Sequence, residues 1–231
     1  MNNFNLSEKS KKYYEENDIY EIFSIAEDYP NKIYKCLLPK IKNKVVLDLG
    51  CGTGKFMKKF YKEALKYYGL DLSNEQLKIA KNKVKSNNVQ FICCSAENIP
   101  LLENSIDVII STWVLGTILE VDRRNKVLEE MKRVLKKDGN IYLVENDIGG
   151  QFEEIRNRYP DIKKTKVYND WIEEHNFICE NKFKTYFKFE NDNQAKEIFS
   201  NIWGENIGKK VTSKIIEQNV IIYKYKNEII D

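Results

Sequence analysis

The chain has 231 residues, of which 42% are hydrophobic and 32% are charged, and its formal net charge at pH 7 is +3. This length and balance predict one globular domain around a single large core, and they argue against intrinsic disorder. Because the 38 basic residues are nearly matched by 35 acidic ones, the charge disfavours nucleic acid as a partner.

Neither a membrane segment nor a disulfide framework is expected. No apolar run exceeds four residues, and the N-terminal segment MNNFNLSEKSKK lacks the apolar stretch of a signal peptide. We therefore expect a cytoplasmic protein without contact to a membrane. The cysteines are odd in number and lack metal-type spacing, so they predict reduced core thiols and no metal site. They are Cys36, Cys51, Cys93, Cys94 and Cys179.

Short apolar runs alternate with helical patterns, which favours crossover units around a parallel sheet. The run at 44–49, KVVLDL, does not alternate and predicts a strand buried on both faces. A strand YYGLDLS at 67–73 ends in Asp71. Between these strands, spacings of three, four and seven predict one helix face, made of Met57, Phe60, Tyr61, Ala64 and Tyr68.

The next helix is expected to begin at Ser73, which acts as N-cap, with Gln76 completing a capping box. Its apolar face is Leu77, Ala80 and Val84. Strands are expected at 88–96, 105–112 and 140–147, and a helix at 121–137 that ends at Asp138 and Gly139.

The last third of the chain is expected to be less regular at first. We predict an irregular stretch at 148–164, a short helix near 166–174, a strand within 177–190, a helix over roughly 193–214 and a last strand at 218–225. Lysines interleaved in the two late strands indicate an antiparallel pair at the edge of the sheet.

Gly50, Gly52 and Gly54 follow the first strand on alternate positions. A strand that runs into glycines and then a helix places backbone N–H groups at the carboxyl edge of a parallel sheet, where such folds bind ligands. The dinucleotide fingerprint has a wider second spacing, so an NAD-linked oxidoreductase is disfavoured. No triphosphate-binding loop pattern is present.

Five segments, in order, resemble the class I S-adenosylmethionine-dependent methyltransferases. They are LDLGCGTG, GLDLS, SAENIPL, IDVIISTWVL and RVLKKDGNIYLVE, which together cover about residues 40–147. The resemblance implies an α/β, Rossmann-like fold with a seven-stranded, mostly parallel sheet, helices on both faces and an antiparallel C-terminal strand. Within a single domain, 1–231, it implies an N-terminal helical lid at 1–40, a cofactor-binding core at 41–147 and a substrate-side half at 148–231 with antiparallel edge strands.

The resemblance also implies S-adenosylmethionine as cofactor and S-adenosylhomocysteine as product. Asp71 ends the second strand, where its carboxylate can accept hydrogen bonds from the ribose hydroxyls; capping of the next helix is the alternative. Glu97 or its neighbouring backbone is expected at the adenine, and a surface acid is the alternative. Ile99 and Leu72 are expected on either side of the ring.

Asp48 is expected to order the glycine loop, with contact to the methionine ammonium as the other possibility. Trp113 is expected near the sulfonium, and ordinary core packing is its alternative. The expected cofactor-binding residues are Asp48, Gly50, Cys51, Gly52, Thr53, Phe56, Asp71, Leu72, Ala96, Glu97, Asn98, Ser111 and Trp113.

The expected reaction is methyl transfer to an oxygen, nitrogen or carbon atom of a small molecule. Transfer from a sulfonium needs mainly alignment and exclusion of water, so no catalytic residue is assigned. The alternatives are an RNA or protein methyltransferase and a non-catalytic S-adenosylmethionine-binding module. The segment after the fourth strand reads STWV in place of an [ND]PP[YF] tetrapeptide. Its absence disfavours the exocyclic nitrogen of a nucleic-acid base or the amide of a glutamine side chain as the methyl acceptor. The oligomeric state is not assigned.

The acceptor site has several candidates. Glu145 and Asp147 end the fifth strand and are candidates to orient or deprotonate an acceptor. His175, the only histidine, is expected to have a local role in a turn rather than to act as a base. Tyr13, Tyr14 and Tyr29 fit either a lid or helix packing, and Phe199 and Trp203 are expected to pack on the sheet rather than line a pocket.

Overall fold

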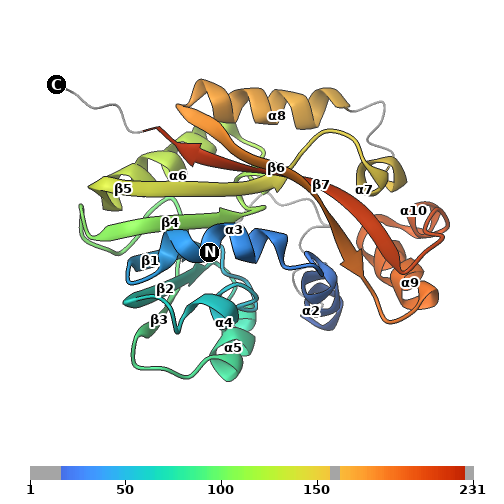
Figure 1. The fold of residues 1–231 in the computed structure, drawn as a ribbon, viewed down its shortest axis with the longest axis horizontal. Helices are drawn as coiled ribbons and strands as arrows, with labels where there is room; N and C mark the ends of the chain where they lie inside the picture. Colours follow the sequence, from blue (N-terminus) through green and yellow to red (C-terminus); the bar gives the residue numbers. More distant parts are fainter. Residues whose placement is uncertain (1–16, 157–161, 227–231) are drawn as a thin grey trace.

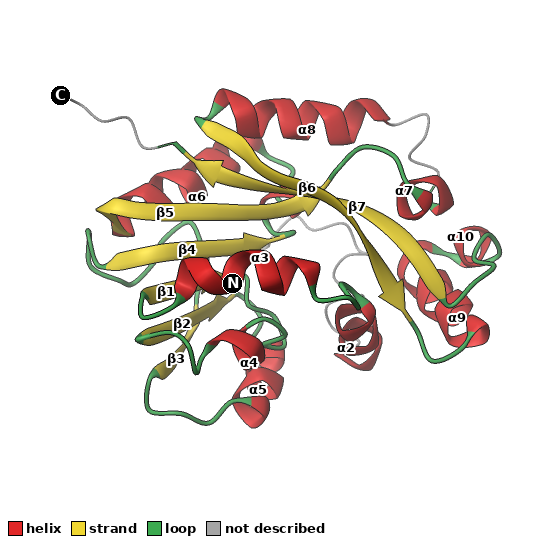
Figure 2. Ribbon diagram, viewed as in Figure 1, coloured by secondary structure: helices red, strands yellow, loops and turns green. Residues whose placement is uncertain are grey.

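The structure, a computed structural model, describes residues 17–156 and 162–226 around a seven-stranded sheet. The strand order is β3-β2-β1-β4-β5-β7-β6, and only β7 runs antiparallel to both of its neighbours. Figures 1 and 2 show the sheet crossing the molecule with helices on either side of it. The strands are β1 (Val45–Leu49), β2 (Lys66–Asp71), β3 (Val89–Cys93), β4 (Ile106–Thr112), β5 (Leu135–Asn146), β6 (Phe177–Lys188) and β7 (Ile215–Tyr225).

The predicted fold class is confirmed, including the antiparallel pair at the C-terminal edge. The strand order reverses between β1 and β4, which is where open α/β sheets bind ligands. The helices are α2 (Asn17–Ala26), α3 (Lys32–Ile41), α4 (Met57–Phe60), α5 (Asn74–Lys83), α6 (Val121–Val134), α7 (Gln151–Ile155), α8 (Ile162–Glu174), α9 (Asp192–Trp203) and α10 (Glu205–Gly208), with a 3₁₀ turn η1 (Leu115–Thr117) after β4.

Apolar side chains cover both faces of the sheet, and alternate residues of β1 belong to the cores on the two faces. Leu47 and Leu49 join the core beneath α6 and α8, whereas Val46 joins the core beneath α3, α4 and α5. A third cluster joins α2, α7 and α9 to β6 and β7. In Figure 1 these helices gather with α10 at the far end of the two long strands.

The helix predicted after the glycine loop is wrong in length. It ends as α4 at Phe60, and Tyr68 lies in β2, where it pairs with Leu47. Tyr61 and Ala64 lie in the turn between the two elements. The helical spacing was coincidental, because the apolar series continued across a turn into a strand that the sheet buries.

Ser73 is the N-cap of α5, as predicted, and its Oγ accepts a hydrogen bond from the Gln76 backbone N–H at 3.3 Å. The second half of the predicted capping box is wrong. The backbone N–H of Ser73 donates to Asp71 Oδ1 at 2.9 Å, so it is not available to the Gln76 side chain.

Three further boundaries differ from prediction. The helix predicted at 121–137 ends at Val134, and the Asp138–Gly139 turn lies inside β5, where the register with β4 shifts. The stretch predicted to be irregular at 148–164 contains α7, and α8 begins at Ile162. The helix predicted over 193–214 is divided into α9 and α10 by Gly204. The φ of Gly204 is 97°, a value that does not occur within an α-helix, and α10 ends at Gly208.

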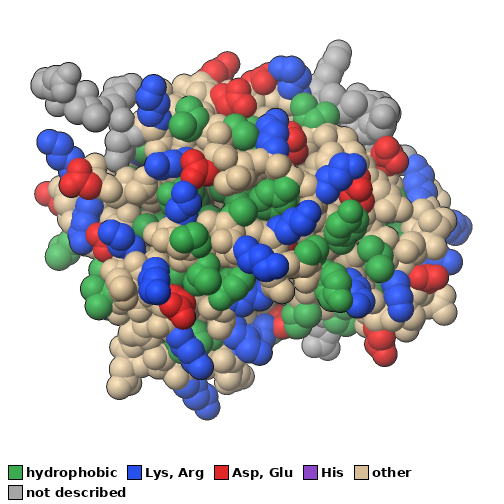
Figure 3. Space-filling model, viewed as in Figure 1, with side chains coloured by type: hydrophobic (Ala, Val, Ile, Leu, Met, Phe, Trp, Pro, Cys, Tyr) green, Lys and Arg blue, Asp and Glu red, His purple; other side chains and the backbone are tan. Residues whose placement is uncertain are grey.

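The surface mixes charges of both signs. Figure 3 shows lysine and arginine side chains interspersed with acidic and hydrophobic ones over this face. In the described part of the chain, no helix combines the length and apolar character needed to cross a bilayer. All five cysteines are free; Cys51 is buried as predicted, but the expectation of core thiols is wrong for Cys93 and Cys179, which are exposed.

Candidate functional site

A cavity of about 1230 Å³ opens at the carboxyl ends of β1, β2, β4 and β5. Leu49, Asp71, Thr112 and Glu145, at or next to the ends of these strands, all line it. Pockets for single small ligands commonly measure about 300 to 1,000 Å³, so this cavity has room for more than one small molecule.

The glycine loop reaches the cavity through Gly50 and Cys51, whereas Gly52 and Gly54 do not line it. Gly50, Gly52 and Gly54 have φ values of 75°, 54° and 80°, which favour glycine. The N–H groups of Gly50 and Cys51 both donate to the carbonyl of Leu70, at 2.7 and 3.0 Å, and so tie the loop to β2. A Cβ on Gly50 would overlap Cγ2 of Val114, which follows β4. The loop is therefore packed tightly against the segment after β4.

The carboxylate of Asp71 accepts hydrogen bonds from the backbone of the glycine loop and of the residue before α5. Its Oδ2 accepts from the Gly52 N–H at 2.8 Å, and its Oδ1 accepts from the Ser73 N–H at 2.9 Å. Burial raises its pKa, while these N–H groups act in the opposite direction. The carboxylate thus has a role near the start of α5, and each oxygen retains a second lone pair for a ligand.

Asp48 lies beneath the loop, 1% exposed, at the cavity wall. Its Oδ2 accepts a hydrogen bond from the Tyr67 hydroxyl at 3.0 Å. Burial raises the pKa of Asp48 to about 7, the nearby Asp71 charge adds to the rise, and the Tyr67 hydrogen bond opposes it.

Several buried polar atoms near the loop lack a partner. They are Thr53 Oγ1, Gln76 Nε2, Ser111 Oγ and Trp113 Nε1. Gln76 and Trp113 line the cavity, whereas Thr53 and Ser111 do not. Cys51 and Phe56 also line it. Buried donors without partners are uncommon, so Gln76 and Trp113 mark a place where a polar ligand fits.

The loop after β3 is only partly at the cavity. Ala96 and Glu97 line it with Leu72, which is 44% exposed, but Asn98 does not. The Glu97 carboxylate forms an ion pair with Arg123 at 2.6 Å. The expectation for Ile99 is wrong, since its side chain is 1% exposed in the core between sheet and α6.

Trp113 lies between the cavity and the core. Its ring lines the cavity and also packs against the core. Its φ is 55°, which is rare for a bulky residue, and its N–H donates to the Val144 carbonyl at 2.9 Å. The Lys55 ammonium lies 5.6 Å from the ring centroid, so the ring already faces a cation.

Glu145 lines the cavity on the other side of the loop after β4, whereas Asp147 does not line it. Asp147 instead forms an ion pair with Lys182 at 3.4 Å. Glu145 is 3% exposed, and its Oε1 accepts from the Tyr168 hydroxyl at 2.7 Å. Burial raises its pKa to about 8, against the opposite effects of Tyr168 and Arg124.

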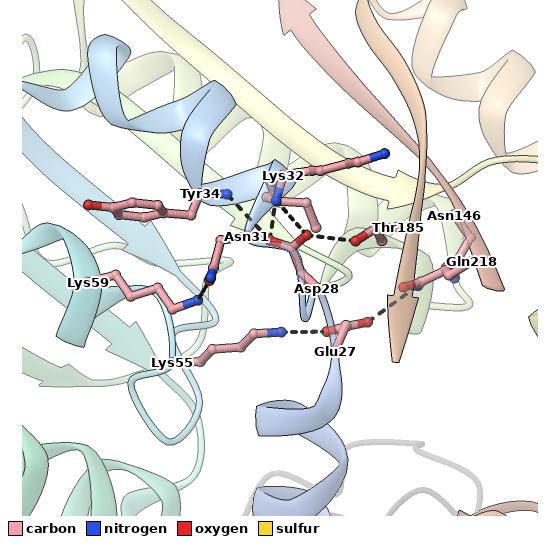
Figure 4. A network of polar contacts seen from close by, with 11 residues as sticks. Glu27, Asp28, Asn31, Lys32, Tyr34, Lys55, Lys59, Asn146, Thr185 and Gln218 are labelled. Carbon is pink, nitrogen blue, oxygen red and sulfur yellow. Dashed lines mark hydrogen bonds and ion pairs between the residues drawn. The ribbon is translucent and has the colours of Figure 1, made fainter. Parts of the chain in front are cut away.

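A buried polar chain, shown in Figure 4, joins the end of α2 to the glycine loop and the last strand. The Lys55 ammonium lies 3.1 Å from Glu27 Oε2, and Gln218 Nε2 donates to Glu27 Oε1 at 3.3 Å and to Asn146 Oδ1 at 2.8 Å. All four residues line the cavity. Sequence reasoning missed Glu27, Lys55 and Gln218, because they lie far apart in the chain and no local pattern links them.

The neighbouring Asp28, also in Figure 4, fixes the start of α3. Its carboxylate accepts from the backbone N–H groups of Lys32 and Ile33 at 2.9 and 3.1 Å and from the Thr185 hydroxyl at 2.7 Å. This contact anchors the segment between α2 and α3 to β6, so the end of α2 is held beside the cavity.

The side chains of Phe23, Phe152 and Trp203 form an aromatic wall of the cavity. The rings of Phe23 and Trp203 lie 5.5 Å apart, those of Phe152 and Trp203 lie 5.7 Å apart, and all three residues line the cavity. The packing prediction is confirmed for Phe199, which is fully buried. Trp203 packs against the same cluster but, against expectation, also lines the cavity.

Tyr29 and His175 do not line the cavity. Tyr29 is 55% exposed and its hydroxyl accepts from the Lys188 ammonium at 2.9 Å; Tyr13 and Tyr14 fall outside the described residues. His175 follows α8, with Nδ1 2.7 Å from the Trp171 carbonyl oxygen, which confirms its predicted local role.

Known proteins resemble the part of the chain that contains the glycine loop. Residues 47–143 match the family described as a methyltransferase domain. The ubiquinone/menaquinone biosynthesis C-methyltransferase UbiE of Campylobacter jejuni is 34% identical over 111 residues, which cover 45% of either chain. The demethylmenaquinone methyltransferase of Thermotoga maritima is 36% identical over 111 residues, which cover 47% of this chain and 46% of that protein.

The fold comparison agrees. The crystal structure of a SAM-dependent methyltransferase from Aquifex aeolicus matches 96% of this chain and 100% of its own with a TM-score of 0.52 and 21% identity. Residues 47–143 are a class I S-adenosylmethionine-dependent methyltransferase domain. The chain spans only about half the length of the curated relatives it matches, 45% for the Campylobacter protein.

The cofactor of this methyltransferase domain is S-adenosylmethionine, and the residues present fit it. Gly50 brings a backbone without a side chain to the cavity lining, Asp71 offers unused lone pairs, and Gln76 Nε2 and Trp113 Nε1 are buried donors without partners. These groups suit a ligand with hydroxyl donors and carboxylate or ring acceptors.

Proposed function

We propose that this chain transfers the methyl group of S-adenosylmethionine to a small-molecule acceptor. The observation that carries the proposal is the single cavity that runs from the glycine loop to the aromatic wall. Its volume and its two chemically different halves suit a nucleoside cofactor beside a second small molecule. The names of the Campylobacter and Thermotoga relatives, which concern quinone methylation, support a small acceptor.

In this proposal the chain's own residues act by binding and alignment. The backbone of the glycine loop and Asp71 hold the nucleoside, and Ala96 and the Glu97 backbone contact the adenine. Trp113 presents its ring to the sulfonium. When bound, the cofactor supplies an electrophilic methyl group, so the protein mainly needs to orient the acceptor and exclude water.

The division of the chain is part of the same proposal. We assign 41–147 to cofactor binding and 148–231 to the acceptor side, with 1–40 as a helical lid over one domain. Within the described part of this N-terminal segment, Tyr20, Phe23, Ser24 and Glu27 from α2 and its end line the cavity. This position supports a lid, because α2 bounds the space between both halves.

The test has two stages. Isothermal titration calorimetry with S-adenosylhomocysteine and with NAD is expected to detect binding of the first compound only. Methyl-labelled S-adenosylmethionine is then offered with a panel of metabolites, and transfer of label is expected to at least one of them. Binding without any transfer would favour a non-catalytic module, and preference for NAD would overturn the proposal.

Should the labelled methyl group appear instead in co-purifying RNA or protein, the small-molecule part of the proposal would be wrong. A steep loss of binding with rising salt would accompany an RNA substrate.

A further inference from the structure

Glu145 is the carboxyl group of the cavity that stands beside the segment after β4. Val144, the residue before it, pairs with Thr112 and its carbonyl accepts the Trp113 N–H, so Glu145 follows directly after the strand residue that is bonded to the Trp113 backbone. On the opposite side of that segment, Val114 packs against Gly50 of the glycine loop. One short segment therefore separates Glu145 from the cofactor half of the cavity.

One oxygen of Glu145 is held and the other is open. Oε1 accepts from the Tyr168 hydroxyl of α8 at 2.7 Å. A Cβ built on Gly116 would lie 3.7 Å from Oε2 and 3.2 Å from the Tyr168 ring. Because Gly116 has no side chain, the space in front of Oε2 belongs to the cavity, and Oε2 is the acceptor that this geometry leaves for a ligand.

Aromatic rings enclose the same cavity. Seven of its lining residues are aromatic, among them Phe23, Phe152 and Trp203 at the wall beyond the polar chain. Flat rings bind well against such walls, and aromatic pairs add about 0.5 to 1.5 kcal/mol to burial alone. The cavity thus combines aromatic walls with the buried carboxyl group of Glu145.

We propose that the methyl acceptor is a hydroxylated aromatic compound whose hydroxyl group donates to Glu145 Oε2, and that Glu145 takes its proton as the methyl group is transferred. This inference rests on the proposed function. The acceptor oxygen forms a bond to the methyl carbon, the carbon–sulfur bond breaks with its electron pair remaining on sulfur, and the hydroxyl proton moves to the Glu145 carboxylate. Charge and atoms balance without a further reactant.

The electrostatics of the site suit this step. The pKa of Glu145, raised to about 8, approaches that of a phenol, about 10 for the tyrosine side chain, so proton transfer between them is feasible. The titratable or charged groups that act on Glu145 from the elements around it are Tyr168 of α8 and Arg124 of α6. Both favour its ionised form, and the ionised fraction grows as the pH rises towards 8.

The test uses phenol, catechol and 1-naphthol with methyl-labelled S-adenosylmethionine, and anisole and 1-methoxynaphthalene as matched compounds without the hydroxyl group. Label is expected in the O-methyl ethers of the hydroxylated compounds only, with a rate that rises with pH up to about 8. Glu145→Gln is expected to lower kcat by about 10² to 10⁴-fold and to remove this rise. Glu129→Gln, the same change at an exposed position on α6, is expected to keep both.

A second variant tests the same step without changing the carboxyl group. Tyr168→Phe removes a hydrogen bond that lowers the pKa of Glu145, so the rise in rate is expected to move to higher pH. A purely structural role for Tyr168 would change the rate without moving this rise.

Calorimetry with S-adenosylhomocysteine distinguishes a failure of the proposed function from a failure of the inference about Glu145. If the wild-type protein does not bind it, the proposed function fails and this inference fails with it. If it binds with equal affinity to the wild type and to Glu145→Gln, the cofactor site is intact. In that case, absence of label in the hydroxylated compounds, a C-methylated product, or an unchanged rate in Glu145→Gln would overturn the inference alone.

Discussion

Replacing Gly50 by alanine is expected to destabilise the fold through two separable effects. At a φ of 75°, any residue with a Cβ loses about 1 to 2 kcal/mol relative to glycine. The new methyl group would also overlap Val114 Cγ2, and overpacking of this kind costs about 1 to 3 kcal/mol. The sum is about 2 to 5 kcal/mol, a large share of the roughly 5 to 15 kcal/mol that stabilises a typical domain.

Urea unfolding measures this loss. With an m value of about 3 kcal/mol/M, a loss of about 3 kcal/mol moves the midpoint by about 1 M. Gly149→Ala is the matched control, because its φ is 79° but the nearest atom to the new methyl group is 3.8 Å away. It is expected to show the backbone effect alone.

Val114→Ala isolates the steric effect. In a Val114→Ala background, the penalty of Gly50→Ala is expected to shrink by about 1 to 3 kcal/mol, because the overlapping methyl group is gone. Equal losses for Gly50→Ala and Gly149→Ala, or no relief from Val114→Ala, would refute the close approach of the glycine loop to the segment after β4.

Three further predictions concern buried charges. Asp71→Ala is expected to weaken S-adenosylhomocysteine binding by roughly 1 to 3 kcal/mol, because two backbone N–H groups lose their acceptor; unchanged affinity in calorimetry would remove Asp71 from the site. Because the pKa of Asp48 rises to about 7 on folding, the folded protein retains a proton that the unfolded chain has lost above about pH 4. The free energy of unfolding should therefore fall between pH 5 and 7, and Asp48→Asn should flatten this slope in urea unfolding; a slope equal to that of the wild type would contradict it. Lys55→Met leaves Glu27 buried without its cation and is expected to cost about 3 to 5 kcal/mol, most of it recovered when Glu27→Gln is added; failure to recover would show that the pair is not coupled.

The sequence was sufficient for the parts of the fold that depend on neighbouring residues. β1, β3 and β4 and the N-cap Ser73 could be predicted because their apolar runs, glycines and capping residue lie within a few positions of one another. The length of α4 could not, because the same apolar spacing occurs in a helix and in a turn followed by a strand. Gly204 was the available signal for the break between α9 and α10.

The candidate site also contains residues that the local sequence predicts and residues that only the folded chain brings together. Gly50 and Asp71 could be found from the sequence because each directly follows or ends a strand of the parallel sheet. The partnership of Glu27 with Lys55 and Gln218 spans 191 residues between its first and last members, so only the folded chain brings them together. The choice between Glu145 and Asp147 also required the structure, since it depends on which side of β5 faces the cavity.

The contact of Gln218 with Glu27 and Asn146 bears on the order of events during synthesis. The glycine loop and the first five strands leave the ribosome well before β7, so a nucleotide-sized crevice can form on the nascent chain while the acceptor wall is still missing. Only when residue 218 emerges does its amide join the end of α2 to β5. Chains halted short of that point are therefore expected to retain the nucleotide while lacking the enclosure that a second molecule requires.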